Sequence, residues 1–210
     1  MRRWFDLTML DRAAIAALKP LLDVGARGLV RMGVGADVVT LAGFGLGIAA
    51  AAAIAFGAFG WALALLLASR LADGLDGAVA RLTHPTDRGA FLDIALDFLF
   101  YASIPLAFAV AEPVANALPA AVLLAAFIGT GSSFLAFAVM AERRGLASTV
   151  YPDKGLFYLG GLTEASETLI CFALMCVWPE RFGWWAYGFA VLCGLTIVAR
   201  IVAGARTLAR

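Results

Sequence analysis

The chain has 210 residues, of which 63% are hydrophobic and 15% charged, with a net charge of +1. Its mean hydropathy of +0.91 excludes an ordinary soluble domain, in which roughly a quarter of the residues are charged. Several apolar runs of about 20 residues are long enough to cross a bilayer, so we expect an integral membrane protein that forms one all-α domain over residues 1–210. No basic cluster is interleaved with aromatic residues, so we expect no nucleic-acid partner.

The first 35 residues differ from the rest because they mix apolar and charged side chains. Over residues 8–32 this mixture follows a roughly helical spacing, which is typical of an amphipathic helix that lies along the membrane interface. Pro20 falls inside the segment and predicts a break in that helix. A solvated N-terminal arm is the alternative. The first apolar run starts late, so we expect no cleavable signal peptide.

Six apolar segments follow, separated by short connections that are rich in turn residues. Because every backbone amide in lipid needs an internal partner, and no barrel-strand pattern is present, all six are expected to be helices. Their approximate limits are 37–57, 60–82, 89–111, 115–141, 155–178 and 183–205. The predicted fold is therefore an N-terminal amphipathic interfacial helix within residues 1–35, followed by a bundle of six transmembrane helices within residues 36–205.

Lysine and arginine residues fall mainly on one side of this arrangement. They precede the first span, lie in the second and fourth connections and end the chain, whereas the first, third and fifth connections together contain only Arg181. Basic residues are retained on the cytoplasmic side of membranes. We therefore expect both termini and the even-numbered connections in the cytoplasm, with a bacterial inner membrane as the location.

The second and third spans carry aspartates at depths where a membrane helix normally has none. Asp73 and Asp76 are three residues apart on one helix face, and Asp93 and Asp97 are four apart near the start of the next span. Because the connection is short, we expect the two helices to be antiparallel neighbours that bring all four carboxylates together at the cytoplasmic rim. Such a cluster needs compensating charge, and hard oxygen ligands suit Mg²⁺ or Mn²⁺. Two divalent ions would balance it and could hold a diphosphate.

Spacing alone leaves two alternatives to a metal site open: a pathway for ion- or proton-coupled transport, and structural pairing with arginines. Arg70 lies three residues before Asp73 and could pair with it on the same helix. Arg81 has no carboxylate one turn before it, which leaves its guanidinium available to a phosphate. The acidic cluster has no clear second copy in the chain, which is atypical of transporters.

The remaining reactive side chains predict no chemistry of their own. His84, the sole histidine, has no second histidine with which to bind a metal. The cysteines lie inside apolar runs without metal-type spacing, so we expect buried hydrophobic residues. They are Cys171, Cys176 and Cys193.

The stretch DGLDGAVAR, followed by Gly-xxx-Asp-xxx-Asp, resembles the signature of the CDP-alcohol phosphotransferase (CDP-alcohol phosphatidyltransferase) family. The matching positions are Asp73, Asp76, Gly77, Ala80, Arg81, Gly89, Asp93 and Asp97. Seven residues separate Arg81 from Gly89, where the usual pattern has eight. The family's plan, an interfacial helix before six spans with the motif across the second and third, is also similar to the plan predicted above.

The resemblance implies a homodimeric transferase of phospholipid biosynthesis. Such an enzyme moves a substituted phosphate group from a CDP-linked donor, with CDP-diacylglycerol favoured, to an alcohol and releases CMP. It implies that Asp73, Asp76 and Asp93 ligate two divalent ions, and that Asp97 is the general base with a metal contact also allowed. The residues then expected at the CDP site are Asp73, Gly77, Ala80, Arg81, Gly89 and Thr40, the last from a weaker match in the first span.

The acceptor alcohol is expected to carry no phosphate. Relatives that use phosphorylated acceptors often have arginines in the fourth span just before an Ala-Glu pair, where this chain has Ala138 and Met140. The fifth span instead carries Glu164 and Glu167, which could recognise hydroxyls or an amine, or could pair with Arg200. The candidate acceptor residues are Glu164, Glu167, Lys154 and Arg143.

Overall fold

A computed structural model describes residues 9–145 and 163–209, with side chains described from residue 19 onward. Within these ranges the chain is helical and has no β-strand, which confirms the all-α prediction. The helices are α1 (Met9–Arg31), α2 (Ala36–Ala55), α3 (Phe59–Leu82), α4 (Asp87–Ala111), α5 (Pro113–Arg143), α6 (Ala165–Val177), the short 3-10 helix η1 (Pro179–Arg181) and α7 (Phe182–Leu208).

Four helical segments in the described ranges are long and apolar enough to cross a membrane. They are α2, α4, α5 and the η1–α7 segment Pro179–Leu208. At 24 residues, α3 is also long, but its second half carries the charged motif. The protein is thus an integral membrane protein, and the first half of the motif lies on α3, the least apolar of the long described helices that follow α1.

The predicted fifth span is not helical over its whole described part. Of the range 155–178, residues 155–162 lie outside the described residues, and α6 begins only at Ala165. Glu164 is its N-cap and forms a reciprocal capping box with Glu167, which fixes the start of the helix. The sequence prediction missed this signal because both glutamates were interpreted as binding residues.

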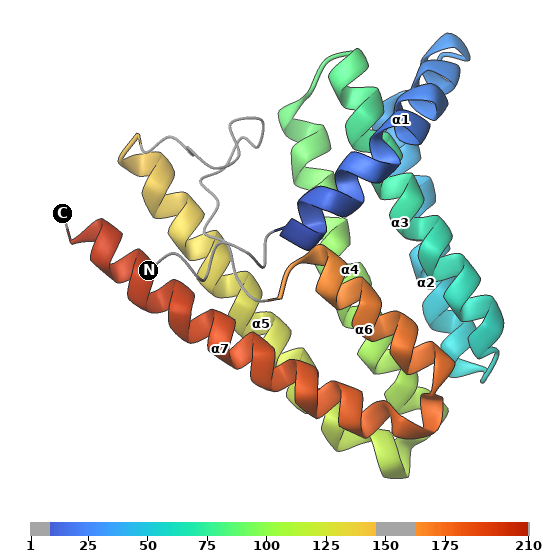
Figure 1. Ribbon diagram of the computed structural model, residues 1–210, viewed down its shortest axis with the longest axis vertical. Coiled ribbons are helices and arrows are strands. Elements are labelled where there is room, and N and C mark those ends of the chain that lie inside the picture. The colour runs from blue at the N-terminus through green and yellow to red at the C-terminus, as the bar shows by residue number, and fades with distance from the viewer. Residues whose placement is uncertain (1–8, 146–162, 210) are drawn as a thin grey trace.

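The N-terminal helix is continuous through Pro20, so the predicted break is wrong. A proline removes one helical hydrogen bond, but packing of a helix face can outweigh that loss. After Pro20, α1 packs closely on α3. A Cβ added to Gly74 would lie 3.1 Å from Leu22, and one added to Gly25 would lie 2.9 Å from Leu75. Figure 1 shows α1 crossing beside α3 at one end of the molecule.

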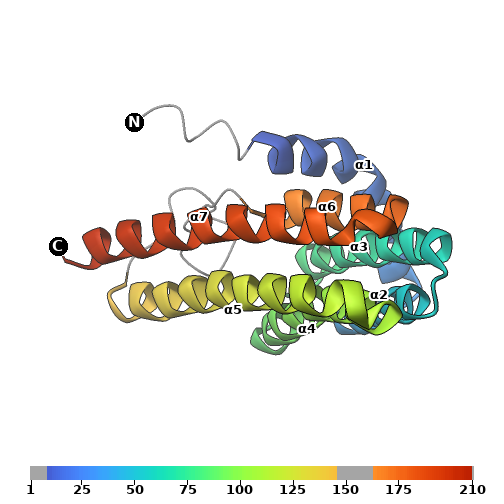
Figure 2. The ribbon, with the colours of Figure 1, turned by 90° about the horizontal axis from the view of Figure 1, so that it is seen from below.

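The remaining helices form two groups joined through α4 and α6. On one side α2 packs against α3 and α4, and on the other α5 and α7 run side by side (Figures 1 and 2). The shared core contains four fully buried phenylalanines, among which the rings of Phe108 and Phe182 stack with centroids 4.5 Å apart. The three free cysteines are buried, as predicted. Phe100 extends this core toward the acidic motif on α3 and α4.

Candidate active site

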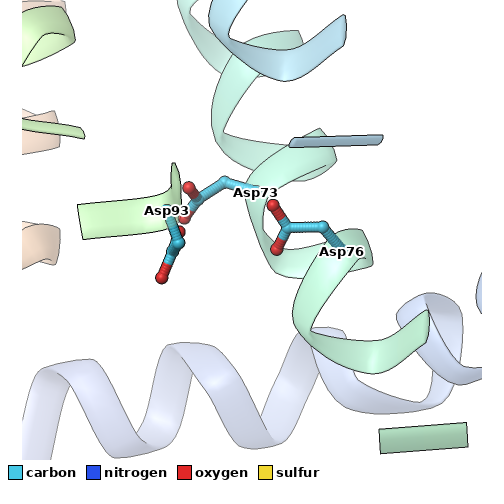
Figure 3. A group of neighbouring side chains, drawn as sticks. All are labelled: Asp73, Asp76 and Asp93. Atoms are coloured by element: carbon cyan, nitrogen blue, oxygen red, sulfur yellow. The ribbon is translucent and has the colours of Figure 1, made fainter. Parts of the chain in front are cut away.

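Three of the four motif aspartates converge, two from α3 and one from α4. Carboxylate oxygens of Asp73, Asp76 and Asp93 lie within 4.8 Å of one another (Figure 3). Asp76 is buried, and its Oδ2 atom has no hydrogen-bond partner among the described residues. A buried carboxylate oxygen is costly unless a donor or a cation compensates it. The cluster therefore fits a divalent cation that prefers oxygen ligands.

The packing of the two motif helices differs from the prediction. We expected α3 and α4 to be direct neighbours, but α2 packs extensively against both of them. Small residues on α2 allow this arrangement. A Cβ added to Gly43 would lie 3.0 Å from the Cβ of Ala72 on α3, and one added to Gly47 would lie 2.5 Å from the ring of Phe100 on α4. Because these glycines let both α3 and α4 pack closely on α2, the aspartates of the two motif helices come together.

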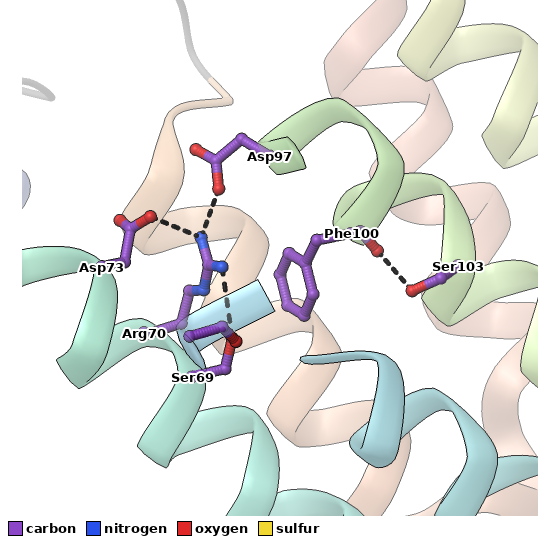
Figure 4. Close-up of polar contacts among 7 residues, drawn as sticks. Ser69, Arg70, Asp73, Asp97, Phe100 and Ser103 are labelled. Carbon is purple, nitrogen blue, oxygen red and sulfur yellow. Dashed lines mark hydrogen bonds and ion pairs between the residues drawn. The ribbon is translucent and has the colours of Figure 1, made fainter. Parts of the chain in front are cut away.

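The fourth aspartate, Asp97, is held by an arginine instead of joining the other three. Nη1 of Arg70 lies 2.7 Å from Oδ1 of Asp97 and 3.5 Å from Oδ1 of Asp73 (Figure 4). The predicted pair between Arg70 and Asp73 is confirmed, but the shorter contact joins residues 27 positions apart. Helical spacing could not reveal that contact. A space of about 10 Å³ remains between Arg70 and the carboxylates of Asp73, Asp93 and Asp97, which is the size of a single water or ion.

A larger cavity of about 460 Å³ opens beside Asp76 and Asp93. It lies between the start of α2, the end of α3 and the start of α4, where Thr86 accepts a hydrogen bond from the Gly89 amide at 3.0 Å. Its size suits a small-molecule ligand. Four of the residues predicted for the CDP site line it: Thr40, Gly77, Ala80 and Gly89.

The other two residues predicted for the CDP site lie outside this lining. Asp73 belongs to the carboxylate cluster described above. Arg81 is exposed near the end of α3, and its Nη1 lies 3.3 Å from the position that a Cβ on Gly77 would take. The guanidinium is thus at the rim of the site and is open to solvent.

Sequence reasoning also missed residues that line the same cavity. Asp37, at the start of α2, lies 3.5 Å from Nε of Arg88 and contributes to the wall. His84, for which no role was predicted, lines the cavity together with Thr83 and Thr86. For the residues of this connection, the signal in the sequence was its position between the two halves of the motif.

A second cavity, of about 240 Å³, lies on the other side of Asp97 between α4, α5, α6 and α7. Its polar lining residues are Asp97, Thr130, Thr163, Glu164, Thr168 and Arg200. Both Glu164 and Arg200 are buried, and Nη1 of Arg200 donates to the carbonyl oxygen of Thr130 at 3.2 Å. Aromatic rings, among them Tyr101 and Phe134, complete the wall. A partly open cavity, in which a few polar side chains interrupt a largely apolar wall, thus adjoins the fourth motif aspartate.

The structure separates the four candidate acceptor residues. Glu164 lines the second cavity, whereas Glu167 accepts from the Glu164 amide at 3.1 Å and caps α6. Arg143 is exposed in the last turn of α5 and is not part of the lining. Lys154 lies outside the described residues.

Comparison with known proteins places this arrangement in a family. A model of the CDP-alcohol phosphatidyltransferase family matches residues 34–196. Inner membrane protein YnjF of Escherichia coli (strain K12) is 48% identical over 200 residues, which cover 95% of this chain and 97% of that protein. The archaetidylinositol phosphate synthase of Methanothermobacter thermautotrophicus is 49% identical over 70 residues, or 33% of this chain and 36% of that protein.

Solved structures share the fold. The phosphatidylinositol phosphate synthase PgsA1 of Mycobacterium tuberculosis with CDP-DAG bound superposes with a TM-score of 0.65 at 24% identity, covering 88% of this chain and 94% of that chain. Its complex with manganese and citrate gives a TM-score of 0.64 at 24% identity, covering 87% and 88%. The family match accounts for the intramembrane aspartates as an enzyme site and disfavours the transporter alternative. The chain is a membrane enzyme that belongs to the CDP-alcohol phosphatidyltransferase family.

Proposed function

We propose that this enzyme transfers a substituted phosphate group from a CDP-linked donor, with CDP-diacylglycerol favoured, to an alcohol acceptor and releases CMP. The observation that carries the proposal is the position of the four aspartates between two cavities, one for each substrate. The wider cavity, lined by Gly77, Ala80 and Gly89, would receive the cytidine diphosphate. The presence of CDP-DAG in the structure of a neighbour with the same fold supports this choice of donor.

Asp73, Asp76 and Asp93 would hold the divalent cations, Mg²⁺ or Mn²⁺, with Asp97 as a further ligand. When bound, two such ions would offset the charge of the pyrophosphate and of the departing CMP. The Asp76 oxygen that has no hydrogen-bond partner among the described residues, together with the narrow spacing of the cluster, supports this assignment. A neighbour with the same fold contains manganese.

Asp97 would act as the general base because, among the residues that the structure describes, it alone borders both the carboxylate cluster and the second cavity. The hydroxyl oxygen of the acceptor forms a bond to the donor phosphorus that carries the lipid. The bond between that phosphorus and the oxygen of CMP breaks, and Asp97 takes the hydroxyl proton. Arg81, exposed at the rim of the donor cavity, would contact a phosphate of the donor.

The second cavity would receive the acceptor, which we propose is a hydroxyl-rich or amine-bearing alcohol without a phosphate. Its described lining includes one acidic and one basic side chain besides Asp97, namely Glu164 and Arg200, with three threonines around them. A phosphate held here would need more than one positive partner. A small polar alcohol would instead find both hydrogen-bond donors and hydrogen-bond acceptors in this lining.

We further propose that α3 and the segment containing α6 cross the membrane with the four apolar spans, which gives six in total. In this arrangement α1 lies along the interface, both termini and the active site face the cytoplasm, and two copies of the chain form a dimer. The excess of basic residues at one side supports the orientation. The relative YnjF, named an inner membrane protein, supports the location.

The reaction is tested with the purified full-length chain, CDP-diacylglycerol or CDP-choline, Mg²⁺ or Mn²⁺, and a panel of alcohols that includes phosphorylated ones. We expect CMP release that requires a divalent ion, CDP-diacylglycerol and an unphosphorylated alcohol. CMP release only with phosphorylated alcohols would overturn the acceptor class. No CMP release with any pair, together with ion flux in liposomes, would overturn the transferase function.

A further inference from the structure

Arg70 is a charged residue of the site that the proposed reaction does not use. Its side chain is only 13% exposed, and it lies between the carboxylates of Asp73 and Asp97 (Figure 4). It precedes the family motif and is not one of the motif positions. A buried guanidinium at the edge of a metal-binding cluster is unexpected, because it competes with cations for the same oxygens.

Residues of neighbouring helices hold the guanidinium on the side that faces away from the carboxylates. Its carbon lies 4.0 Å from the centre of the Phe100 ring on α4, a distance typical of a cation–π contact. Its Nη2 donates to Oγ of Ser69 at 3.3 Å, and that hydroxyl donates to the Gly43 carbonyl of α2 at 2.7 Å. Residues of α2, α3 and α4 therefore determine the orientation of the planar group before any substrate binds.

We propose that Arg70 is a positioning residue that orients Asp97 toward the acceptor cavity and supplies a built-in positive charge to the carboxylate cluster. The 2.7 Å contact uses Oδ1 of Asp97, so the arginine fixes the rotamer of the carboxylate that faces the acceptor. It also balances one of the four negative charges at the side of the cluster where Asp73 and Asp97 meet. A divalent ion at that side must therefore bind close to the positive charge of Arg70, which repels it.

Two separable effects follow. Loss of the charge strengthens binding of divalent ions, because the carboxylates lose a competing cation. Loss of the planar fork lowers turnover, because Asp97 is no longer held in place. Lysine keeps the charge but cannot reproduce the fork, so Arg70→Lys distinguishes the two effects. The second effect rests on the proposed role of Asp97 as base, whereas the first does not.

The experiment measures Mn²⁺ binding by electron paramagnetic resonance and CMP release for the full-length protein in nanodiscs. Three variants are compared with the wild type: Arg70→Gln, Arg70→Lys and, as a control for the loss of one arginine, Arg181→Gln. Arg181 is exposed in η1, far along the chain from the motif. We expect Arg70→Gln to bind Mn²⁺ about tenfold more tightly and to lose about 10- to 100-fold in kcat, with the KM for the donor unchanged.

Arg70→Lys should bind Mn²⁺ like the wild type and still lose turnover, and Arg181→Gln should match the wild type in both. Mn²⁺ affinity that is unchanged or weaker in folded Arg70→Gln would overturn the charge role. Full turnover in Arg70→Lys would overturn the positioning role, and this variant decides the matter if Arg70→Gln does not fold. If the wild type itself releases no CMP, the proposed function fails, while the Mn²⁺ comparison still tests the charge of Arg70.

Discussion

At the scale of single residues, the four aspartates do not form one equivalent set. Three carboxylates lie within 4.8 Å of one another, whereas Asp97 is bound by Arg70 and borders the second cavity. The sequence predicted that these residues converge because helical spacing places them on common faces. It could not predict the division among them, because that depends on the contact of Arg70 on α3 with Asp97 on α4 and on the Phe100 ring beneath the arginine.

Glu164 provides a residue-scale test of the proposal that the second cavity binds the acceptor. Glu164→Gln removes its negative charge but keeps an oxygen that can cap α6, so we expect the KM for the acceptor to rise several-fold while the KM for CDP-diacylglycerol stays the same. Steady-state CMP release with each substrate varied in turn measures both constants. Glu180→Gln, exposed in η1, is the control and should change neither. An unaltered acceptor KM in Glu164→Gln would place the acceptor elsewhere.

At the scale of elements, α2 determines how the motif helices meet. Most helix limits were predicted to within a few residues, because apolar runs and turn residues mark them clearly. The packing order was not predicted, since the short connection between α3 and α4 suggested direct neighbours. The relevant signal was the run of glycines in α2, whose effect becomes visible only when Phe100 and Ala72 are seen against it.

Two glycines of α2 give a matched comparison of this packing. A methyl group at Gly47 would lie 2.5 Å from the Phe100 ring, whereas one at Gly45 meets no described atom within 4 Å. We expect Gly47→Ala to destabilise the protein by about 1–3 kcal/mol through overpacking and to lower turnover, because Phe100 supports Arg70. Gly45→Ala should keep or slightly raise stability. Thermal unfolding in detergent and CMP release measure both, and equal effects of the two substitutions would contradict this account of the packing.

At the scale of the whole molecule, two cavities lie on opposite sides of one acidic cluster. The composition was sufficient to predict a helical membrane protein, and the motif was sufficient to predict the family. The second cavity could not be predicted, because its lining residues extend from Asp97 to Arg200 and meet only when α4, α5, α6 and α7 pack together. The capping box at Glu164 was also not predicted, because glutamates in an apolar run were interpreted as binding residues and not as the start of a helix.

The orientation of the chain is a prediction at this scale. With both termini in the cytoplasm, a cysteine introduced by Thr207→Cys near the end of α7 should be labelled by a membrane-impermeant maleimide only after the cells are permeabilised. A cysteine introduced by Glu180→Cys should be labelled in spheroplasts with an intact inner membrane. Both positions are exposed, and the native cysteines are buried, so the unsubstituted protein gives the background. The reverse pattern would place the active site on the outer face.

The most direct measurement of the central claim compares Asp97→Asn with the wild type in Mn²⁺-dependent CMP release and in CDP binding. Asparagine keeps the shape of the side chain but cannot take a proton from the acceptor at neutral pH. If Asp97 is the base beside a metal-binding cluster formed by the other three aspartates, CMP release falls to background while Mn²⁺-dependent CDP binding stays close to that of the wild type. Wild-type turnover in Asp97→Asn would contradict that assignment.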